Sequence, residues 1–433
     1  MAAIRLTYIG GGSTRAPGTV ASLVERGRRF AGSEIVLVDL DADRLDVVAE
    51  IARRMARARA VDIRVTTTTD RAAGLTDADL VLTSFRPGGF EARALDERIP
   101  LRHGVIGQET QGPGGFFMAL RSIHAMREIV ADIERVAPRA RLVNYTNPVN
   151  IVSEAVTHHS AIPTVSLCEG PLTFPADSVV NAGLDPARLD ATLVGLNHTG
   201  WTVRHEYDGQ DLIPLVRDAA ERRAADPSGS RRSNLMLALA ASMASLPSAY
   251  LWYYYFRDEA IEEALAKPTT RAEDILAGVD GYWAHYREQA AAAEPVLDPG
   301  RSRGGILELE LAVDVIDAWV NDTGETWPVN VPNAGGALPG FPDDLVVEVP
   351  GRVDASGITP LPVPPLRREV VGLIQALGEY QALTAEAGWS GTRREAVAAL
   401  AGHPLVLSLT RAEAIYDEMA AAHRAWLPER LLR

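Results

Sequence analysis

The chain has 433 residues, enough for two domains, and its 47% hydrophobic and 23% charged residues are typical of a soluble globular protein. Its formal net charge of −14 argues against a nucleic-acid partner and requires a local basic pocket for any anionic substrate. The single cysteine excludes an internal disulfide, and neither a signal peptide nor an apolar run of about 18 residues is present, so we expect a cytoplasmic protein that spans no membrane.

The first part of the chain alternates predicted strands with predicted helices. Short apolar runs predict strands over residues 4–9, 34–38, 63–68, 80–84, 141–145 and 163–167, and helical patterns fill the gaps. This alternation indicates a parallel sheet with helices on both faces. We therefore predict an α/β protein with a Rossmann-like, doubly wound domain over residues 1–168. A second, α+β domain would follow over residues 169–433.

A glycine-rich loop follows the first predicted strand. Its sequence is Gly10-Gly11-Gly12-Ser13-Thr14, and a helical pattern comes next. Glycines let the backbone approach a pyrophosphate, and a helix N-terminus attracts the negative charge. Asp39 ends the second strand, where a carboxylate can bind the ribose hydroxyls of NAD. It lies 27 residues after Gly12, and Arg15 replaces the usual third glycine. The loop predicts an NAD site, and a tight turn without ligand is the alternative.

A second glycine-dense run spans residues 104–115, after the charged segment 93–98. Each glycine costs a helix about 1 kcal/mol relative to alanine, so the run predicts a loop. This loop would bring Gln108, Glu109 and Thr110 into a site. The alternative is a solvated surface loop.

Asn147 follows the strand predicted over 141–145, and Pro148 restricts the turn there. The carboxyl end of a strand in such a sheet faces the ligand, so Asn147 is a candidate substrate contact. The alternative is that Asn147 only caps the next helix.

Three isolated residues complete the set of candidates. Cys168 ends the last predicted strand, His198 follows Asn197, and Tyr250 opens a tyrosine-rich segment. From the residues alone, a small buried cysteine and a structural histidine remain open alternatives.

In this order, these segments resemble glycoside hydrolase family 4, the NAD- and metal-dependent glycosidases. The resemblance covers nearly the whole chain and includes segments 10–14, 93–97, 107–115, 144–148, 168, 195–198, 250, 303–305, 329–333 and 343–350. It implies a fold like that of lactate and malate dehydrogenases and a homodimer or homotetramer. It also implies two cofactors, NAD and a divalent metal, with Mn²⁺ favoured over Ni²⁺, Co²⁺ or Fe²⁺.

The implied reaction is a redox-neutral glycoside hydrolysis. NAD⁺ takes a hydride from C3 of the sugar, and the resulting ketone acidifies the proton at C2. Removal of this proton leads to elimination at the C1–oxygen bond. Water then adds, and NADH returns the hydride. The metal polarises the C3 oxygen and stabilises the enolate.

Matching the family's motifs implies a role for each candidate. Cys168 and His198 would bind the metal, because thiolate and imidazole suit a transition ion. Tyr250 would be the base that removes the C2 proton. An ordinary tyrosine has a pKa near 10, so Arg271 and the metal would favour the phenolate and Glu109 would accept its proton.

Arg93, Asn147 and Arg271 match substrate-binding positions, and Ser13 and Arg271 are candidate phosphate contacts. Glu169 is implied as the acid that protonates the leaving group, although α-specific members carry aspartate at this position and β-specific members asparagine. Segment 100–121 is more similar to the 6-phospho-β-glucosidase branch. The predicted substrate is therefore a 6-phosphorylated β-glucoside. The alternative within the family is an α-specific enzyme, namely a 6-phospho-α-glucosidase or an enzyme similar to α-galactosidases.

Two readings outside the family remain. In a malate- or lactate-type dehydrogenase, His198 would transfer a proton, Arg93 would bind a carboxylate, and NAD⁺ would be consumed. In a sensing protein, the scaffold would bind a sugar or NAD without catalysis. The pair of Cys168 and His198, together with Tyr250, disfavours the dehydrogenase, because that chemistry needs neither the pair nor the tyrosine. The same three intact residues argue against the sensing protein.

Overall fold

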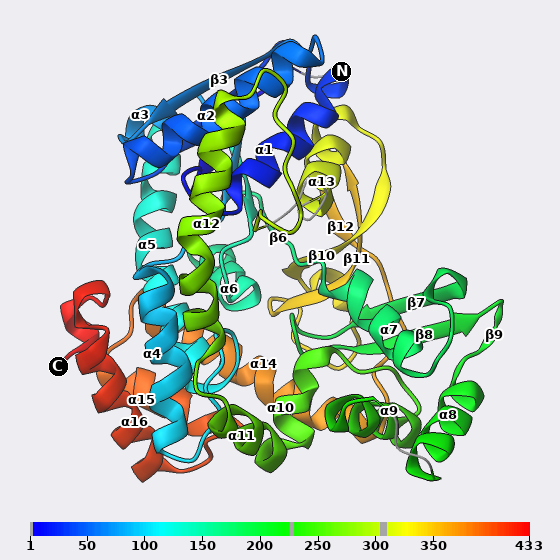
Figure 1. Cartoon of the computed structure of the whole chain (residues 1–433). Helices are drawn as coiled ribbons and strands as arrows, with labels where there is room; N and C mark the ends of the chain where they lie inside the picture. The colour runs from blue at the N-terminus through cyan, green and yellow to red at the C-terminus, as the bar shows by residue number, and fades with distance from the viewer. Residues whose placement is uncertain (1–2, 226–228, 304–309) are drawn as a thin grey trace.

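A nine-stranded sheet organises the computed structural model, which describes residues 3–225, 229–303 and 310–433 (Figure 1). Six of its strands are parallel and lie in the order β3-β2-β1-β4-β5-β6, which is the Rossmann order. Their bounds are Arg5–Ile9 (β1), Ser33–Val38 (β2), Ile63–Thr68 (β3), Leu80–Thr83 (β4), Arg141–Asn144 (β5) and Thr164–Ser166 (β6). All six strands predicted from the sequence are confirmed.

Helices cover both faces of this parallel sheet. On β2, Ile35 and Leu37 point into a core that contains residues of α1 and α2, whereas Val36 and Val38 point into a core that contains residues of α5 and α6. The sheet is therefore doubly wound, as predicted. The helices of this part are Ala16–Glu25 (α1), Ala42–Ala58 (α2), Arg71–Leu75 (α3), Gly89–Arg102 (α4), Gly112–Val136 (α5) and Val149–His159 (α6).

Three strands from the last quarter of the chain extend the same sheet. β10 (Glu325–Pro332) pairs antiparallel with β6 through Asn330 and Ser166, and β11 (Val346–Asp354) and β12 (Gly357–Pro360) follow. The main sheet thus contains strands from both sides of the predicted domain boundary at residue 168. That boundary stays a prediction.

A smaller antiparallel sheet lies beside the main one (Figure 1). It consists of β7 (Leu189–Val194), β8 (Trp201–Tyr207) and β9 (Gln210–Asp211). An isolated bridge joins Gly195, just after β7, to Glu348 of β11. This bridge connects the two sheets next to the candidate site. The helices around the small sheet are Gly170–Asn181 (α7), Ile213–Ala225 (α8) and Arg231–Met243 (α9).

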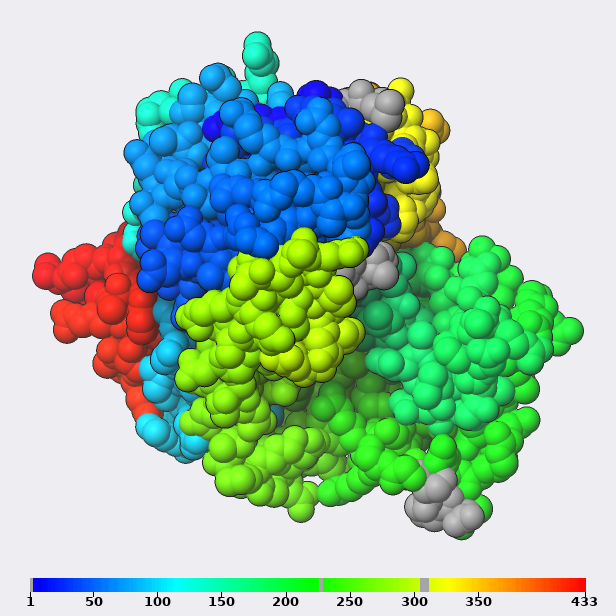
Figure 2. Space-filling model, turned by 45° about the horizontal axis from the view of Figure 1, so that its top comes forward, coloured from blue at the N-terminus to red at the C-terminus, as the bar shows by residue number. Residues whose placement is uncertain are grey.

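Helix α12 (Arg271–Ala291) runs from the green part of the molecule back to the N-terminal helices. It packs against α2 and α4, and Figure 2 shows its yellow-green residues against the blue N-terminal part. The remaining helices are Trp252–Tyr255 (α10), Arg257–Ala266 (α11), Glu310–Asn321 (α13), Arg368–Trp389 (α14), Arg393–Gly402 (α15) and Leu409–Ala422 (α16). Among the described residues, no helix is long and apolar enough to cross a membrane.

The second glycine-dense run differs from its prediction. Helix α5 begins at Gly112, so the end of the run is helical and only the part up to Gln111 is a loop. A Cβ on Gly114 would overlap the carbonyl oxygen of Gln108 and lie 2.6 Å from that of Asp96. Close packing against the neighbouring backbone therefore outweighs the low helix propensity of glycine. Gln108, Glu109 and Thr110 do lie in the loop, as predicted.

Candidate functional site

The candidate residues gather at the carboxyl ends of the parallel strands. The glycine loop follows β1, Asp39 follows β2, Asn147 follows β5, and Cys168 follows β6. Because parallel strands end at the same edge of a sheet, these four places share one side of the molecule. His198 reaches this edge from the small sheet, four residues after β7 ends.

The glycine loop turns closely over the ends of β2 and β4. The backbone N–H groups of Gly10 and Gly11 donate to the carbonyl oxygen of Val38, at 2.9 and 3.1 Å. Gly10 has a φ of +96°, and a Cβ there would overlap the carbonyl oxygen of Ser84. Glycine is therefore required at this turn.

Asp39 lies directly against this loop. Its Oδ2 accepts from the N–H of Gly12 at 2.9 Å, and its Oδ1 accepts from the N–H of Leu40 at 2.7 Å. The far end of the loop is held by α12, because the hydroxyl of Tyr286 donates to the carbonyl oxygen of Thr14 at 2.8 Å. The carboxylate keeps further lone pairs for hydroxyl groups, so the loop and Asp39 fit a dinucleotide.

Cys168 and His198 face each other across the edge of the sheet. The Sγ of Cys168 lies 3.5 Å from Nε2 of His198, and the N–H of Gly170 points at the same sulfur from 3.4 Å. His198 has a left-handed φ of +68°, and the hydroxyl of Ser248 donates to its carbonyl oxygen. A thiolate and an imidazole at this separation fit a transition-metal ion.

Among the described residues, no group of three or more His, Cys, Asp or Glu side chains lies close enough to hold a metal. Two protein ligands leave coordination positions open for water or substrate oxygens. Burial, and then the charge of Glu348, raise the pKa of Cys168 to about 12. Burial lowers the pKa of His198 to about 4. Metal binding would therefore displace the thiol proton but meet a neutral imidazole.

Tyr250 stacks on the metal-binding candidate His198. The two rings are parallel within 1°, with their centroids 4.0 Å apart, and the ring of Phe174 packs edge-on against Tyr250 at 5.8 Å. Burial, and then the charges of Glu109 and Cys168, raise the pKa of Tyr250, while Arg93 lowers it. The phenol is therefore protonated near neutral pH unless a cation comes close.

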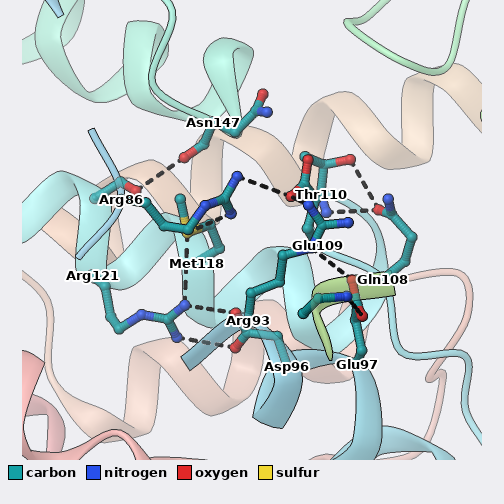
Figure 3. Close-up of polar contacts among 12 residues, drawn as sticks. Arg86, Arg93, Asp96, Glu97, Gln108, Glu109, Thr110, Met118, Arg121 and Asn147 are labelled. Carbon is teal, nitrogen blue, oxygen red and sulfur yellow. Dashed lines mark hydrogen bonds and ion pairs between the residues drawn. The ribbon is translucent and has the colours of Figure 1, made fainter. Parts of the chain in front are cut away.

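Glu109 is paired with two arginines (Figure 3). Its Oε2 lies 3.0 Å from Arg86, and the same oxygen pairs with Arg93, whose Nε donates to Glu97 at 2.7 Å. Burial acts to raise the pKa of Glu109, but Arg86 and Arg93, with more distant arginines, lower it to about 2. This carboxylate is a weak base. Its predicted role as the acceptor of the tyrosine proton stays a prediction, which the low pKa disfavours.

The charges of four arginines lower the pKa of Glu109, and we call them the arginine cluster: Arg15, Arg86, Arg93 and Arg303. Burial, and then Arg15 and Arg86, lower the pKa of Arg303 to about 9. Burial is the largest cause of this lowering, and the neighbouring guanidiniums add to it, so an anion bound here would be favoured.

Sequence reasoning missed Arg86 and Arg303 as site residues. Arg86 follows β4 at the same edge as Asn147, so the strand-end argument would have found it. Arg303 belongs to a segment of the resemblance whose other members, Gly304 and Gly305, lie outside the described residues.

Three predicted residues remain. Asn147 is half-buried beside the start of α6, where its carbonyl oxygen accepts from Ser122 at 2.9 Å. Pro148 is the cap residue of α6, and no side chain caps that helix, so the capping alternative for Asn147 is not observed. Glu169 accepts from the hydroxyl of Tyr145 at 3.1 Å, just before α7.

Within the described part of the chain, no hydrogen bond or ion pair links the Arg271 side chain to the other candidate residues. Its side chain is exposed at the first residue of α12. The next residue, Ala272, does reach the site, because its N–H donates to Glu97 at 2.9 Å. The start of α12 is therefore attached to the network of Arg93 and Glu109, while Arg271 itself is exposed.

Comparison with known proteins gives consistent matches over the chain. The model of family 4 glycosyl hydrolases matches residues 5–180, and the model of the C-terminal domain of that family matches residues 193–406. A probable 6-phospho-β-glucosidase of Bacillus subtilis is 35% identical over 438 residues, covering 98% of each chain. A 6-phospho-α-glucosidase of Leptotrichia buccalis is 31% identical over 443 residues, again covering 98% of each chain.

Solved structures are similar over the same extent. A 6-phospho-α-glucosidase from gut microorganisms, in complex with NAD and Mn²⁺, has a TM-score of 0.86 at 26% identity and covers 99% of this chain and 100% of its own. The 6-phospho-β-glucosidase of Thermotoga maritima, with manganese, NAD⁺ and glucose-6-phosphate, has a TM-score of 0.83 at 26% identity and covers 98% and 99%. The malate dehydrogenase of Aeropyrum pernix, with a TM-score of 0.53 at 16% identity over 88% of this chain and 97% of its own, shares the fold alone. The predicted fold class is confirmed.

Proposed function

The chain belongs to the family 4 glycosyl hydrolases, and from this premise we propose that it hydrolyses a 6-phosphorylated β-glucoside with the help of NAD and a divalent metal. The observation that carries the phosphate assignment is the arginine cluster around Glu109, in a chain whose net charge is −14. A phosphate would bring further negative charge to these guanidiniums.

The residues present fit both cofactors. We propose that residues 10–14 and Asp39 bind NAD and that Cys168 and His198 bind the metal, which is Mn²⁺ in similar solved structures. The chemistry that the bound groups supply is reversible hydride acceptance by NAD and polarisation of a sugar oxygen by the metal. The donor set of one sulfur and one nitrogen leaves Ni²⁺, Co²⁺ and Fe²⁺ as alternative ions.

Tyr250 would act as the general base that removes the C2 proton. Its ring lies flat on His198, so a cation bound beside that imidazole would lower the pKa that burial raises. Glu169 would donate a proton to the leaving group, with its carboxyl held by Tyr145. Arg93 and Asn147 would contact the sugar phosphate, and Arg271 remains a proposed contact.

Support for the β anomer comes from the 35% identity to a probable 6-phospho-β-glucosidase. An α-specific relative at 31% identity keeps the α-glucoside as the alternative. Glu169 differs from both the aspartate and the asparagine expected at this position, so its longer side chain would place the acid differently. We further propose a cytoplasmic homodimer or homotetramer in which residues 1–168 bind NAD and residues 169–433 bind substrate and metal.

The deciding experiment is release of p-nitrophenol from α- and β-linked glucosides, each with and without a 6-phosphate. Mn²⁺, NAD⁺ and a thiol reductant are present, and each is omitted in turn. We expect cleavage of the 6-phosphorylated β-glucoside that requires both cofactors and accumulates no NADH. Preference for the α compound would move the proposal to the α branch. NADH formation from simple hydroxy acids would overturn the glycosidase.

The arginine cluster gives a second measurement. Arg86→Met should raise KM for the phosphorylated substrate by about 10-fold or more, because a guanidinium–phosphate contact is worth at least ~1.4 kcal/mol. The matched control is Arg98→Met, since Arg98 lies exposed on α4 and pairs with Glu273. Equal KM values for the two variants would show that the cluster does not bind the phosphate.

A further inference from the structure

The loop before α5 holds the imidazole of His198 from the side opposite Cys168. The Oγ1 of Thr110 lies 2.8 Å from Nδ1 of His198, whereas Nε2 faces the sulfur of Cys168 at 3.5 Å. Both Thr110 and His198 are buried, with 7% and 6% of their surface exposed. The neutral ring has one hydrogen, and its position decides which nitrogen can bind a metal.

Gln108 fixes the direction of this hydrogen-bond chain. Its side-chain oxygen accepts from the backbone N–H groups of Thr110 at 2.6 Å and Gln111 at 2.9 Å. Backbone N–H groups only donate, so the atom between them is the amide oxygen and not the nitrogen. The hydroxyl of Thr110 lies 3.0 Å from the same oxygen and therefore donates its single hydrogen to Gln108.

The hydroxyl oxygen of Thr110 can then only accept from His198. A second donor confirms its role as an acceptor, since the side-chain nitrogen of Gln111 approaches it at 3.4 Å. The oxygen of that same amide accepts from the hydroxyl of Tyr254 at 2.6 Å. It follows that Nδ1 of His198 carries the hydrogen and Nε2 carries the lone pair that faces Cys168.

We propose that Gln108 and Thr110 are positioning residues that hold His198 in the Nδ1–H tautomer, so that Nε2 is free to bind the metal. This inference rests on the proposed function, which assigns His198 as a metal ligand. The partner of the second ring nitrogen commonly sets the tautomer and orientation of a metal-binding histidine, and its loss costs 10–100-fold in metal affinity. Here that partner is a threonine hydroxyl whose own hydrogen is directed away by Gln108.

The test compares Thr110→Val with Thr110→Ser. Valine keeps the shape but removes the hydroxyl, so Nδ1 loses its acceptor and the ring can take the other tautomer. Serine keeps the hydroxyl. Mn²⁺ affinity, measured by electron paramagnetic resonance, should fall 10–100-fold in Thr110→Val and stay within about 3-fold of the wild type in Thr110→Ser. Gln108→Met should resemble Thr110→Val, because the hydroxyl hydrogen is no longer directed away from Nδ1.

A second readout needs neither metal nor activity. The metal-free protein is labelled with ¹⁵N-histidine, and the His198 signals are assigned by their loss in His198→Gln. We expect the Nδ1–H pattern in the wild type and Thr110→Ser, and its loss in Thr110→Val. Unchanged NAD affinity and thermal unfolding check that each variant is folded.

The outcomes separate this proposal from the proposed function. An Nε2–H pattern in the wild type, or Thr110→Val with wild-type Mn²⁺ affinity, overturns the positioning role. A wild-type protein that shows the Nδ1–H pattern but binds no Mn²⁺ upholds the tautomer and overturns the metal assignment of the proposed function.

Discussion

Two glutamates at the same site lie in opposite electrostatic surroundings. Glu109 pairs with Arg86 and Arg93, and these arginines lower its pKa to about 2 against the effect of burial. Glu348 is 1% exposed, and one of its oxygens accepts from the side chains of Asn197 at 2.8 Å and Asn330 at 3.0 Å. Burial raises the pKa of Glu348 to about 7 despite these two amides.

The difference shows that burial alone does not decide the charge of a carboxyl group. Burial disfavours both carboxylates. Two cations reverse its effect on the pKa of Glu109, whereas two neutral amides do not cancel its effect on the pKa of Glu348. The arginine side of the site thus keeps fixed charges suited to an anion. The side behind Cys168 and Asn197 holds an acid that is about half neutral near pH 7.

Removing a cation from the arginine side should have the largest effect on stability. Arg93 is 7% exposed and pairs with both Glu97 and Glu109. Arg93→Met removes a positive charge that pairs with the carboxylates of Glu97 and Glu109. We therefore expect a loss of about 3–5 kcal/mol in the free energy of unfolding. Urea unfolding at one protein concentration, without metal or NAD, measures it.

The same helix offers the control for this experiment. The side chain of Arg98 on α4 is 45% exposed and pairs with Glu273 in solvent. Arg98→Met should cost less than about 1 kcal/mol. If both variants lose the same stability, the charges around Glu109 do not hold the site together.

On the side of the site that holds Glu348, Glu348→Gln should change how the free energy of unfolding depends on pH. The pKa of Glu348 is raised from 4.5 to about 7 on folding, so the folded state holds the proton more tightly. This contribution is fully present below pH 4.5 and is lost as the pH rises through 7. Between pH 5 and pH 8 the wild type should therefore lose about 2.5 kcal/mol that Glu348→Gln does not lose.

Urea unfolding of the metal-free proteins at pH 5 and pH 8 gives this difference. Comparing the two pH values for each protein removes any fixed cost of packing the amide. If the free energy of unfolding changes equally between pH 5 and pH 8 in wild type and variant, Glu348 is ionised at both pH values. The contrast with Glu109 would then disappear.

Much of the fold could be predicted from local pattern, but its extension could not. The six parallel strands are short apolar runs between turn residues, and all were predicted. The addition of β10 to β6 depends on one antiparallel contact between Asn330 and Ser166, which no local pattern encodes. The glycines at the start of α5 were predicted as a loop for a related reason. The packing of Gly114 against Gln108 and Asp96 appears only in the folded chain.

The site shows the same division. Cys168, His198 and Tyr250 were predicted as a group, and the structure places them in contact, although their roles stay predictions. Glu348 appeared only as part of a sequence segment, because its burial between two asparagines depends on β10, β11 and the turn after β7 meeting in space. Arg271 matched a motif position, yet its side chain is exposed in the single chain.

The smallest expected effect comes from one of the two amides that hold Glu348. Asn330→Leu keeps the size of the side chain and removes the N–H that lies 3.0 Å from Glu348. We expect a loss of about 1 kcal/mol at pH 5, where the acceptor is a neutral acid, and about 2 kcal/mol at pH 8, where it is a carboxylate. In a Glu348→Gln background the cost should be the same at both pH values, because the acceptor no longer titrates. A cost that still rises with pH in that background would place the titrating group elsewhere, and the neutral side of the site would have to be explained without Glu348.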